Sequence, residues 1–375
     1  MKILFTSDLH LDLRNYGRVN PLTGVHSTVE KLVKEFNDTL DRAIKSDVDI
    51  WVICGDVTHT KTPDNYVREA FAKVIQRARV ASIKVYVLLG NHDKLTVKGK
   101  RSNFADLVAM NIPGLHVIEE ATKFIDHGLQ MIFIPWEKDV TSIVQKIRDQ
   151  IKVIDEDSPA ILIGHFTVNG SELGSERAFI LGPEGTVPIS ELVSDKVQRV
   201  FLGHIHKRQV FEKGKIRYCG SMDRIDFGER NESKGSTLLD INVKTKETKV
   251  TFVEGTPREL TQFNFDSIEE ANKFFDSTKQ PSGGIFKIKV KCLDQDKRKL
   301  NLEQMYKFLK NADYICPPKF EIEKLEEERK QNKELTQELS LSDALGIWLK
   351  AQELSDDLKK AVKREAVRLM SEEMI

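Results

Sequence analysis

Short apolar runs alternate with amphipathic stretches along residues 1–255. The runs are rich in β-branched residues and nearly free of charge, which predicts strands that are covered on both faces. They lie at residues 3–7, 50–54, 85–89, 131–135, 160–163, 199–202 and 236–243. Between them, residues 28–45 and 64–79 carry apolar side chains at helical spacing. This alternation predicts a layered α/β domain.

The predicted helix at 64–79 has a recognisable start. Thr62 can cap it, and Pro63 suits the first helical position, where a missing N–H costs no hydrogen bond. Its apolar stripe consists of Val67, Ala70, Phe71, Val74, Ile75 and Ala78. The ordinary interpretation of such a stripe is packing against a core.

The pattern changes after residue 255, where two predicted strands alternate with two predicted helices. The strands are expected at 260–265 and 286–291, and the helices at 267–275 and 301–310. Mixed charges then dominate 321–338, which is typical of a linker or an exposed helix. Two short amphipathic helices follow. We therefore expect three parts, at residues 1–255, 256–325 and 326–375.

Composition narrows the class of protein. The chain has 375 residues, and its 58 Lys and Arg balance its 58 Asp and Glu, so it has no net basic charge. If it binds nucleic acid, the basic surface should therefore be local, or a partner should supply part of the binding. No stretch approaches the ~20 apolar residues of a membrane span, and the first residues read as a strand, not as a signal peptide. We expect a cytoplasmic protein without a membrane partner. Four cysteines without a CxxC pair are expected to be buried free thiols.

Five short polar segments begin where predicted strands stop. They are Asp-Leu-His at 8–10, Gly-Asp-Val-Thr-His at 55–59, Gly-Asn-His-Asp at 90–93, Gly-His at 164–165 and Gly-His-Ile-His at 203–206. Ligands of open α/β sheets collect beyond the carboxyl ends of the strands, so these segments can converge although they are far apart in the sequence. One such segment alone is more often a turn with a satisfied histidine. Five in one domain predict a shared site.

The residue types in these segments suit a pair of metal ions. Two ions about 3.5–4 Å apart can clamp the attacking and leaving oxygens of a phosphoryl displacement. A carboxylate can bridge them because it offers two anionic oxygens, and imidazole and amide groups can complete each shell. Asp, His and Asn without thiolates favour Mn²⁺, Fe²⁺ or Zn²⁺.

The order of these segments resembles that of the calcineurin-like metallophosphoesterases. His59, three residues after Asp56, and the stretch 218–229 followed by Lys234-Gly235 are similar to the SbcD-type nuclease subunits of DNA double-strand-break repair. The resemblance implies a metallophosphoesterase β-sandwich flanked by helices, in the α/β class, with a small α+β cap domain and C-terminal helices.

The resemblance also implies roles for individual residues. The first metal would be held by Asp8, His10, Asp56 and His206, and the second by Asp56, Asn91, His165 and His204. His92 would face the scissile phosphate, with Asp93 orienting it, and His59 would lie on the substrate side. The cofactors would be two divalent ions, with Mn²⁺ preferred and Mg²⁺, Fe²⁺ or Zn²⁺ as alternatives.

Further candidates come from basic and apolar positions. The cations Lys94, Lys98, Lys100 and Arg101, and more weakly Arg14 and Arg18, could contact DNA phosphates, or they form solvated loops. Six apolar residues near the end of the chain are candidates for binding a partner: Leu341, Leu345, Trp348, Leu349, Leu358 and Val362. These helices could instead fold back on the cap domain.

The resemblance names the partner as an SbcC-type coiled-coil ATPase. It also implies that helices 64–79 and 103–110 pair two copies into a homodimer within a heterotetramer. The predicted function is a metal-dependent DNA nuclease, both exonuclease and endonuclease, that acts in such a repair complex. The alternatives are a phosphomonoesterase of the same superfamily and a non-catalytic scaffold subunit.

Overall fold

The computed structural model describes the chain except for residues 96–101, 175–184, 278, 323–348, 350–354 and 373–375. The described chain forms two compact units. Unit 1 comprises Met1–Phe263, Gln280–Lys287 and Leu309–Pro317, and unit 2 comprises Asn264–Lys279, Ile288–Phe308 and Pro318–Ile375. Among the described helices, none combines the length and the apolar character that crossing a membrane requires.

Two six-stranded sheets form the centre of unit 1. The first has the order β12-β11-β1-β2-β3-β4, and the second β5-β6-β7-β8-β10-β9. Strands β1 to β4 are parallel, as are β6, β7, β8 and β10. The first sheet comprises β1 (Lys2–Thr6), β2 (Ile50–Ile53), β3 (Lys84–Leu88), β4 (Leu115–Ile118), β11 (Gly235–Ile241) and β12 (Thr248–Glu254). The second comprises β5 (Thr122–Asp126), β6 (Leu129–Ile134), β7 (Ala160–His165), β8 (Arg199–Gly203), β9 (Gln209–Phe211) and β10 (Ile216–Tyr218).

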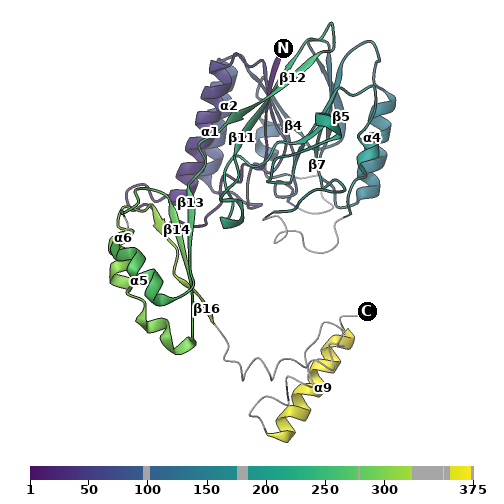
Figure 1. Cartoon of the computed structure of the whole chain (residues 1–375). Helices are drawn as coiled ribbons and strands as arrows, with labels where there is room; N and C mark the ends of the chain where they lie inside the picture. The colour runs from purple at the N-terminus through teal and green to yellow at the C-terminus, as the bar shows by residue number, and fades with distance from the viewer. Residues whose placement is uncertain (96–101, 175–184, 278, 323–348, 350–354, 373–375) are drawn as a thin grey trace. The chain divides into compact units, whose positions relative to one another are not determined.

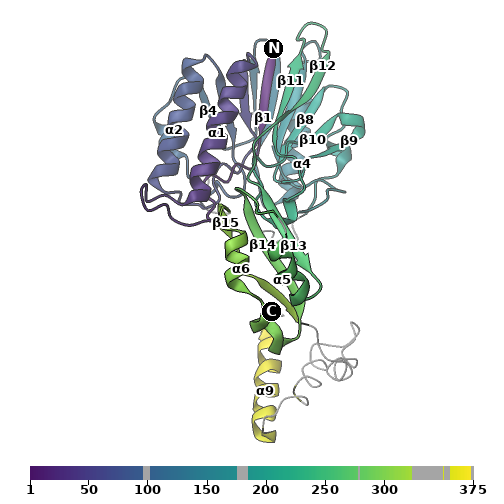
Figure 2. The same cartoon turned by 60° about the vertical axis from the view of Figure 1, so that its left-hand side comes forward.

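The sheets face each other, and helices cover their outer sides (Figure 1, Figure 2). Leu4 packs in the same cluster as residues of α1 (Ser27–Lys45) and α2 (Asn65–Val80). Phe5, the next residue, points between the sheets and stacks on Phe201 at a ring-centroid distance of 3.8 Å. Helix α4 (Val140–Lys152) covers the second sheet through Ile143 and Ile147. Strands buried on both faces explain the continuous apolar runs, and the predicted sandwich is confirmed.

Some local predictions were wrong. Helix α2 begins at Asn65, and its cap is Asp64, whose carboxylate accepts a hydrogen bond from the amide of Val67 at 3.0 Å. Thr62 and Pro63 therefore precede the helix, because the Asp64 side chain satisfies an N–H of the first turn. Helix α3 is shorter than expected (Ala105–Ala109). The sequence also missed β4, β5, β9, β10 and β12, which are short or alternate between buried and exposed positions.

A four-stranded sheet follows, in which β13 (Leu260–Phe265) pairs β14 (Ile285–Cys292), and β14 pairs β15 (Tyr314–Ile315) and β16 (Lys319–Ile322). In unit 2, α5 (Ile268–Ser277) packs on α6 (Leu302–Phe308), with the rings of Phe274 and Phe308 5.5 Å apart. Short 3₁₀ turns lie at Ile189–Glu191, Glu212–Gly214, Phe227–Glu229 and Asp294–Lys299. The predicted boundaries at residues 255 and 325 remain predictions.

Helix α9 (Asp356–Glu372) is the last described element. Of the candidate partner-binding residues, Leu341, Leu345 and Trp348 lie outside the described residues. Leu349 is buried, Val362 is half-buried, and Leu358 is 48% exposed. All four cysteines are buried and free, as predicted.

Candidate metal centre

The parallel strands bring the predicted site residues to one edge of the sandwich. Asp8 and His10 follow β1, Asp56 follows β2, and Asn91 follows β3. The second sheet contributes His165 at the end of β7, and His204 and His206 after β8. All except Asn91, which is partly exposed, are buried. Since parallel strands end at the same edge, residues separated by two hundred positions meet there.

The backbone of this edge is unusual. Asp8, His10, Asp56 and His204 have φ values of 51°, 44°, 52° and 88°, in the left-handed region that non-glycine residues rarely adopt. Hydrogen bonds between the first two loops hold these residues, including Asp8 N–H to Gly55 O at 3.0 Å and His10 N–H to Asp56 O at 3.1 Å. Such strain persists where surrounding structure enforces it, and it concentrates at functional sites.

The glycines make room for the polar side chains. A Cβ atom on Gly90 would lie 2.1 Å from Oδ1 of Asp56, and a Cβ atom on Gly203 would lie 2.1 Å from the carbonyl oxygen of Cys54. Neither glycine has a positive φ. Close approach, not a sharp turn, therefore requires glycine at these two positions.

Two groups of potential ligand atoms share this pocket. In the first, Asp8, His10 and His206 have ligand atoms within 4.8 Å of one another, and the Nε2 atoms of the two histidines are 3.2 Å apart. In the second, Asp56, His165 and His204 form a group of the same kind. Asp56 Oδ2 lies 3.4 Å from Nε2 of His165 and 4.0 Å from Nε2 of His10. Asp56 therefore lies where a bridging ligand is needed.

Asn91 completes the second group. Its Oδ1 lies 3.1 Å from Nε2 of His165 and 3.1 Å from Nδ1 of His204. The amide oxygen is an acceptor with no proton to give. A cation among these atoms would satisfy the oxygen and both imidazoles together.

Partners outside the two groups set the histidine tautomers. Nδ1 of His165 donates to the carbonyl oxygen of Cys54 at 2.7 Å, and Nδ1 of His206 donates to Oε1 of Glu229 at 3.0 Å. Because both partners are acceptors, the proton of each neutral ring sits on Nδ1 and the lone pair on Nε2 faces the pocket. The nitrogen and oxygen donors present fit divalent ions such as Mn²⁺, Fe²⁺ or Zn²⁺.

The buried carboxylates and histidines of the pocket shift one another's pKa values. Burial favours the neutral form of Asp56, but His165 and His92 outweigh it and hold its pKa well below the usual range. Burial also opposes a charge on His165, yet Asp56 and Asp8 raise its pKa to about 9. Burial raises the pKa of Asp8 and, with Asp56 nearby, raises that of Asp93 to about 6. Negative charge that retains a proton on His165 would equally attract a metal cation.

His10, His59 and His92 form a third group. Nδ1 of His92 donates to the carbonyl oxygen of His59 at 2.7 Å. Nδ1 of His59 lies 3.4 Å from Nδ1 of His10. Burial lowers the pKa of His59 and of His10, and His92 lowers both further. The two candidate substrate-side histidines therefore adjoin the first ligand group.

The hydrogen-bond partners of Asp93 are backbone amides, and its predicted role of orienting His92 remains a prediction. Its carboxylate accepts hydrogen bonds from the amides of Val57, Thr58 and Gly90 at 3.1, 3.2 and 3.0 Å. The partner that the structure gives to Nδ1 of His92 is a backbone carbonyl. Asp93 thus ties the loop after β2 to the loop after β3.

Other residues of the site were not predicted from the sequence. Asp12 accepts hydrogen bonds from the amides of His59 and Thr60. Glu229 is buried and pairs with the buried ammonium of Lys234 at 2.7 Å, and Lys234 also donates to the carbonyl of His206 at 3.0 Å. His206 and Lys234 hold the pKa of Glu229 well below its usual range, although burial opposes this. Glu229 and Lys234 belong to the stretch 218–229 and the following Lys234-Gly235, which resemble the SbcD-type subunits. This resemblance was the sequence signal that could have identified them.

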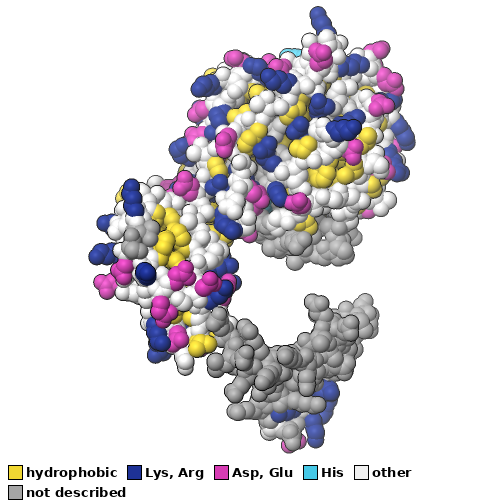
Figure 3. Space-filling view, in the orientation of Figure 1, with side chains coloured by type: hydrophobic (Ala, Val, Ile, Leu, Met, Phe, Trp, Pro, Cys, Tyr) yellow, Lys and Arg dark blue, Asp and Glu magenta, His cyan; other side chains and the backbone are white. Residues whose placement is uncertain are grey.

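The candidate DNA-contacting cations are only partly described. Lys98, Lys100 and Arg101 lie outside the described residues. The ammonium of Lys94 donates to the carbonyl of Trp136 at 2.5 Å, and burial lowers its pKa. Arg14 pairs with Asp64. On the face seen in Figure 3, basic and acidic side chains are interspersed.

The sandwich with carboxylates and histidines at its strand ends defines a metallophosphoesterase. Residues 1–208 match the model of the calcineurin-like phosphoesterase family. This match covers more than half of the chain, and the chain belongs to that family, whose members are hydrolases that use divalent metal ions.

Individual relatives are more distant. The chain is 25% identical over 265 residues to the SbcD component of the nuclease SbcCD of Staphylococcus epidermidis, a match that covers 64% of this chain and 66% of that protein, just under two thirds of its length. It is also similar to the structure of a dimetal phosphatase from Danio rerio, with a TM-score of 0.41 and 12% identity over 68% of this chain and 96% of that one. The structure of the purple acid phosphatase PPD1 of yellow lupin (Lupinus luteus) is similar with a TM-score of 0.42 and 12% identity, over 64% of this chain and 49% of that one.

Proposed function

We propose that this protein is a metal-dependent DNA nuclease that hydrolyses phosphodiester bonds, as an exonuclease and also as an endonuclease. The observation that carries the proposal is the position of Asp56 between two groups of ligand atoms, with His92 and His59 beside them. Two divalent ions bound there would polarise the phosphate and lower the pKa of water. Asp8, His10, Asp56 and His206 would hold one ion, and Asp56, Asn91, His165 and His204 the other.

The protein side chains have distinct tasks in this proposal. Because Nδ1 of His92 donates to the carbonyl of His59, His92 would exchange a proton or a hydrogen bond with the substrate phosphate at Nε2. The amide of His92 donates to Oδ1 of Asp56 at 2.9 Å, which ties the two residues together. Asp93 would act at a distance, by holding the loops that carry Asp56 and His92.

A nucleic-acid substrate is favoured over a small monoester. The support comes from His59 on the substrate side, from the strands and helices after residue 255, and from the similarity to a protein named as a nuclease component. These features have no evident use in hydrolysing a small phosphomonoester. They agree with the SbcD-like pattern of the stretch 218–229.

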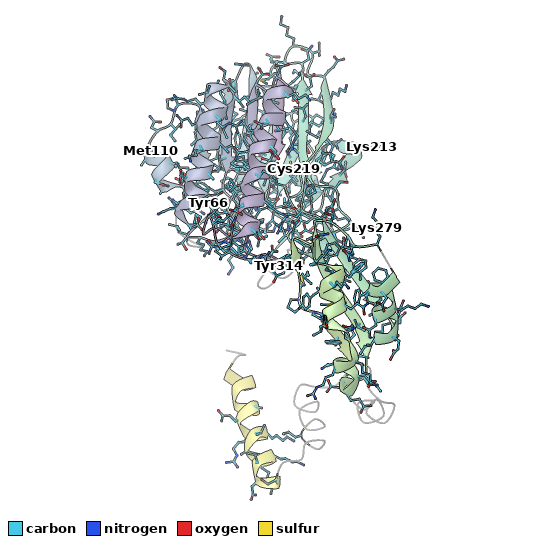
Figure 4. All side chains as sticks on the ribbon, turned by 90° about the vertical axis from the view of Figure 1, so that its left-hand side faces the viewer. Tyr66, Met110, Lys213, Cys219, Lys279 and Tyr314 are labelled. Atoms are coloured by element: carbon cyan, nitrogen blue, oxygen red, sulfur yellow. The ribbon has the colours of Figure 1, made fainter. Side chains whose placement is uncertain are left out.

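We propose further that the protein acts with an SbcC-type coiled-coil ATPase in DNA break repair. The apolar residues Leu349, Leu358 and Val362, with the undescribed Leu341, Leu345 and Trp348, would bind that partner. Two copies would pair through α2 and α3. Tyr66 and Met110, labelled on the outer side of this region in Figure 4, are 38% and 67% exposed.

The test compares two substrates under one condition. The full chain in Mn²⁺ is expected to degrade linear duplex DNA and to act weakly on p-nitrophenyl phosphate, and Asp56→Ala should abolish DNA cleavage. Hydrolysis of the monoester with intact DNA would establish a phosphomonoesterase instead. Failure to bind Mn²⁺ at any concentration in a metal-content measurement would favour a scaffold role.

A further inference from the structure

A small polar cavity lies at one flank of the sandwich, between the second sheet and the first. Its volume is about 160 Å³, and its lining residues are Arg208, Gln209, Val210, Arg217, Tyr218 and Thr237. Gln209 and Val210 belong to β9, which is the last strand of its sheet, whereas Thr237 belongs to β11 of the opposite sheet. Figure 2 shows β9 to β12 on the same side of the molecule.

Two arginines, Arg208 and Arg217, line this cavity, and a third lies near Arg217. Arg208 lies over the ring of Phe252, 3.4 Å from its centroid. Nε of Arg217 donates to the carbonyl of Gly214 at 3.2 Å. Arg199 is close enough to Arg217 to lower its pKa, in addition to the larger effect of burial. All three arginines are half-buried.

No carboxylate neutralises these charges within the described residues. The lining contains no Asp or Glu, and the ion pairs of the described chain include none of the three arginines. Nε of Arg199 is buried without a hydrogen-bond partner among those residues. Half-buried cations without a counter-charge are unfavourable. The arrangement therefore favours binding of an anion.

The shape of the cavity restricts that anion. Its volume is below the roughly 300–1,000 Å³ of pockets that enclose whole cofactors or drug-sized ligands. Guanidinium groups bind phosphate through paired N–H donors, and stacking on an aromatic ring fixes their orientation beforehand. Arg208 precedes β9, Arg217 lies in β10, and Arg199 lies in β8, so N–H donors from separate segments are available to the several oxygens of a phosphate group.

We propose that Arg208 and Arg217, assisted by Arg199, form a second phosphate-binding site that is separate from the metal centre and takes one phosphate group. The group would come from a nucleic-acid backbone or from free inorganic phosphate. Binding of a nucleic-acid phosphate at this site rests on the proposed nuclease function, whereas binding of free inorganic phosphate does not. Phe252 would position the guanidinium of Arg208.

The experiment uses the full chain loaded with Mn²⁺ and the double variant Arg208→Gln/Arg217→Gln. The control is Lys213→Gln, which removes an exposed charge from the neighbouring turn (Figure 4). In a calorimetric titration with inorganic phosphate, the double variant should lose a binding event or weaken it about tenfold. In DNA-binding anisotropy at several salt concentrations, the salt slope of the double variant should fall by about 1–2.

Each outcome decides the proposal. Weakening in both titrations identifies a backbone-phosphate site, and weakening with inorganic phosphate alone identifies a site for the free anion. If the double variant behaves like Lys213→Gln in both, the site does not exist. Arg208→Gln alone leaves β10 unchanged and serves as a second variant should the double variant unfold.

Hydrolysis of bis-p-nitrophenyl phosphate separates this inference from the proposed function. The arginine variants should retain the wild-type rate with this small diester, because the metal centre is intact. Suppose that the wild-type protein cleaves no DNA, and that the double variant binds phosphate more weakly than the wild type does. The nuclease proposal then fails, and the second phosphate site stands.

Discussion

Oε1 of Glu229 accepts a hydrogen bond from Nδ1 of His206 at 3.0 Å, while Oε2 of the same carboxylate pairs with the buried Lys234 at 2.7 Å. Glu229 thus holds the ring of His206 with Nε2 toward His10. A carboxylate behind a metal-binding histidine fixes the ring and makes its lone pair a stronger ligand. The amide of Ile225 donates to Oε2 of Glu229 at 3.1 Å, so the carboxylate is itself fixed in position.

Glu229→Gln should weaken metal binding. A neutral amide can still accept from His206, but it removes the negative charge that polarises the ring, so we expect Mn²⁺ affinity to fall about 10–100-fold. Isothermal titration calorimetry measures this directly. The control is Glu232→Gln, which removes the other carboxylate beside Lys234, at 2.8 Å, without touching His206. Equal losses in the two variants would mean that Glu229 stabilises the fold and does not tune the ligand.

His92→Asn and Asp56→Ala should separate catalysis from metal binding. His92 lies in the third histidine group and belongs to neither of the two proposed metal-ligand groups. His92→Asn should therefore leave the metal content unchanged. It should stop DNA cleavage, because the proposed contact of His92 with the substrate phosphate is lost. Asp56→Ala should lose both, because its carboxylate serves both groups. Metal content by mass spectrometry, measured beside nuclease activity, tests the pair. Equal metal loss in both variants would contradict the assigned roles.

Gly90→Ala should disturb the metal centre by steric overlap, without removing any proposed ligand. The added Cβ would meet Asp56 Oδ1 at 2.1 Å, so the carboxylate must move. We expect a loss of about 1–3 kcal/mol in the free energy of unfolding and weaker Mn²⁺ binding. Gly228→Ala is the matched control, because its Cβ would meet only the far end of the Asp226 side chain at 2.9 Å. Retention of full Mn²⁺ affinity by Gly90→Ala would show that Asp56 is not held in place by this contact.

Met110→Glu should disrupt pairing of two copies. Val108 and Met110, in or beside α3, are 43% and 67% exposed, and a cavity of about 170 Å³ with largely apolar lining lies next to them. Exposed apolar groups of this kind mark interaction surfaces. Light scattering after size-exclusion chromatography should show a dimer for the wild type and a monomer for Met110→Glu. Ile125→Glu, at an equally exposed position (67%) in β5 of the second sheet, should remain dimeric. A wild-type monomer would reject the pairing.

The sequence by itself determined which segments reach the site. Apolar strands buried on both faces leave a continuous signal, and polar residues directly after such strands stand out from it. Asp8, Asp56 and His165 could therefore be assigned to one edge of the sandwich from the order of residues alone. The edge strands β9 and β12 carry no comparable signal, because their exposed positions interrupt the apolar pattern.

Only the tertiary structure decided the contacts that loops make after the strands end. Glu229 reaches His206, and Asp93 reaches the amides of Val57 and Thr58, through turns whose course depends on long-range packing. Arg208 likewise meets the ring of Phe252 only because the two sheets face each other at that flank. Strand periodicity is a local property of the chain, whereas the meeting of side chains from separate loops depends on the whole fold.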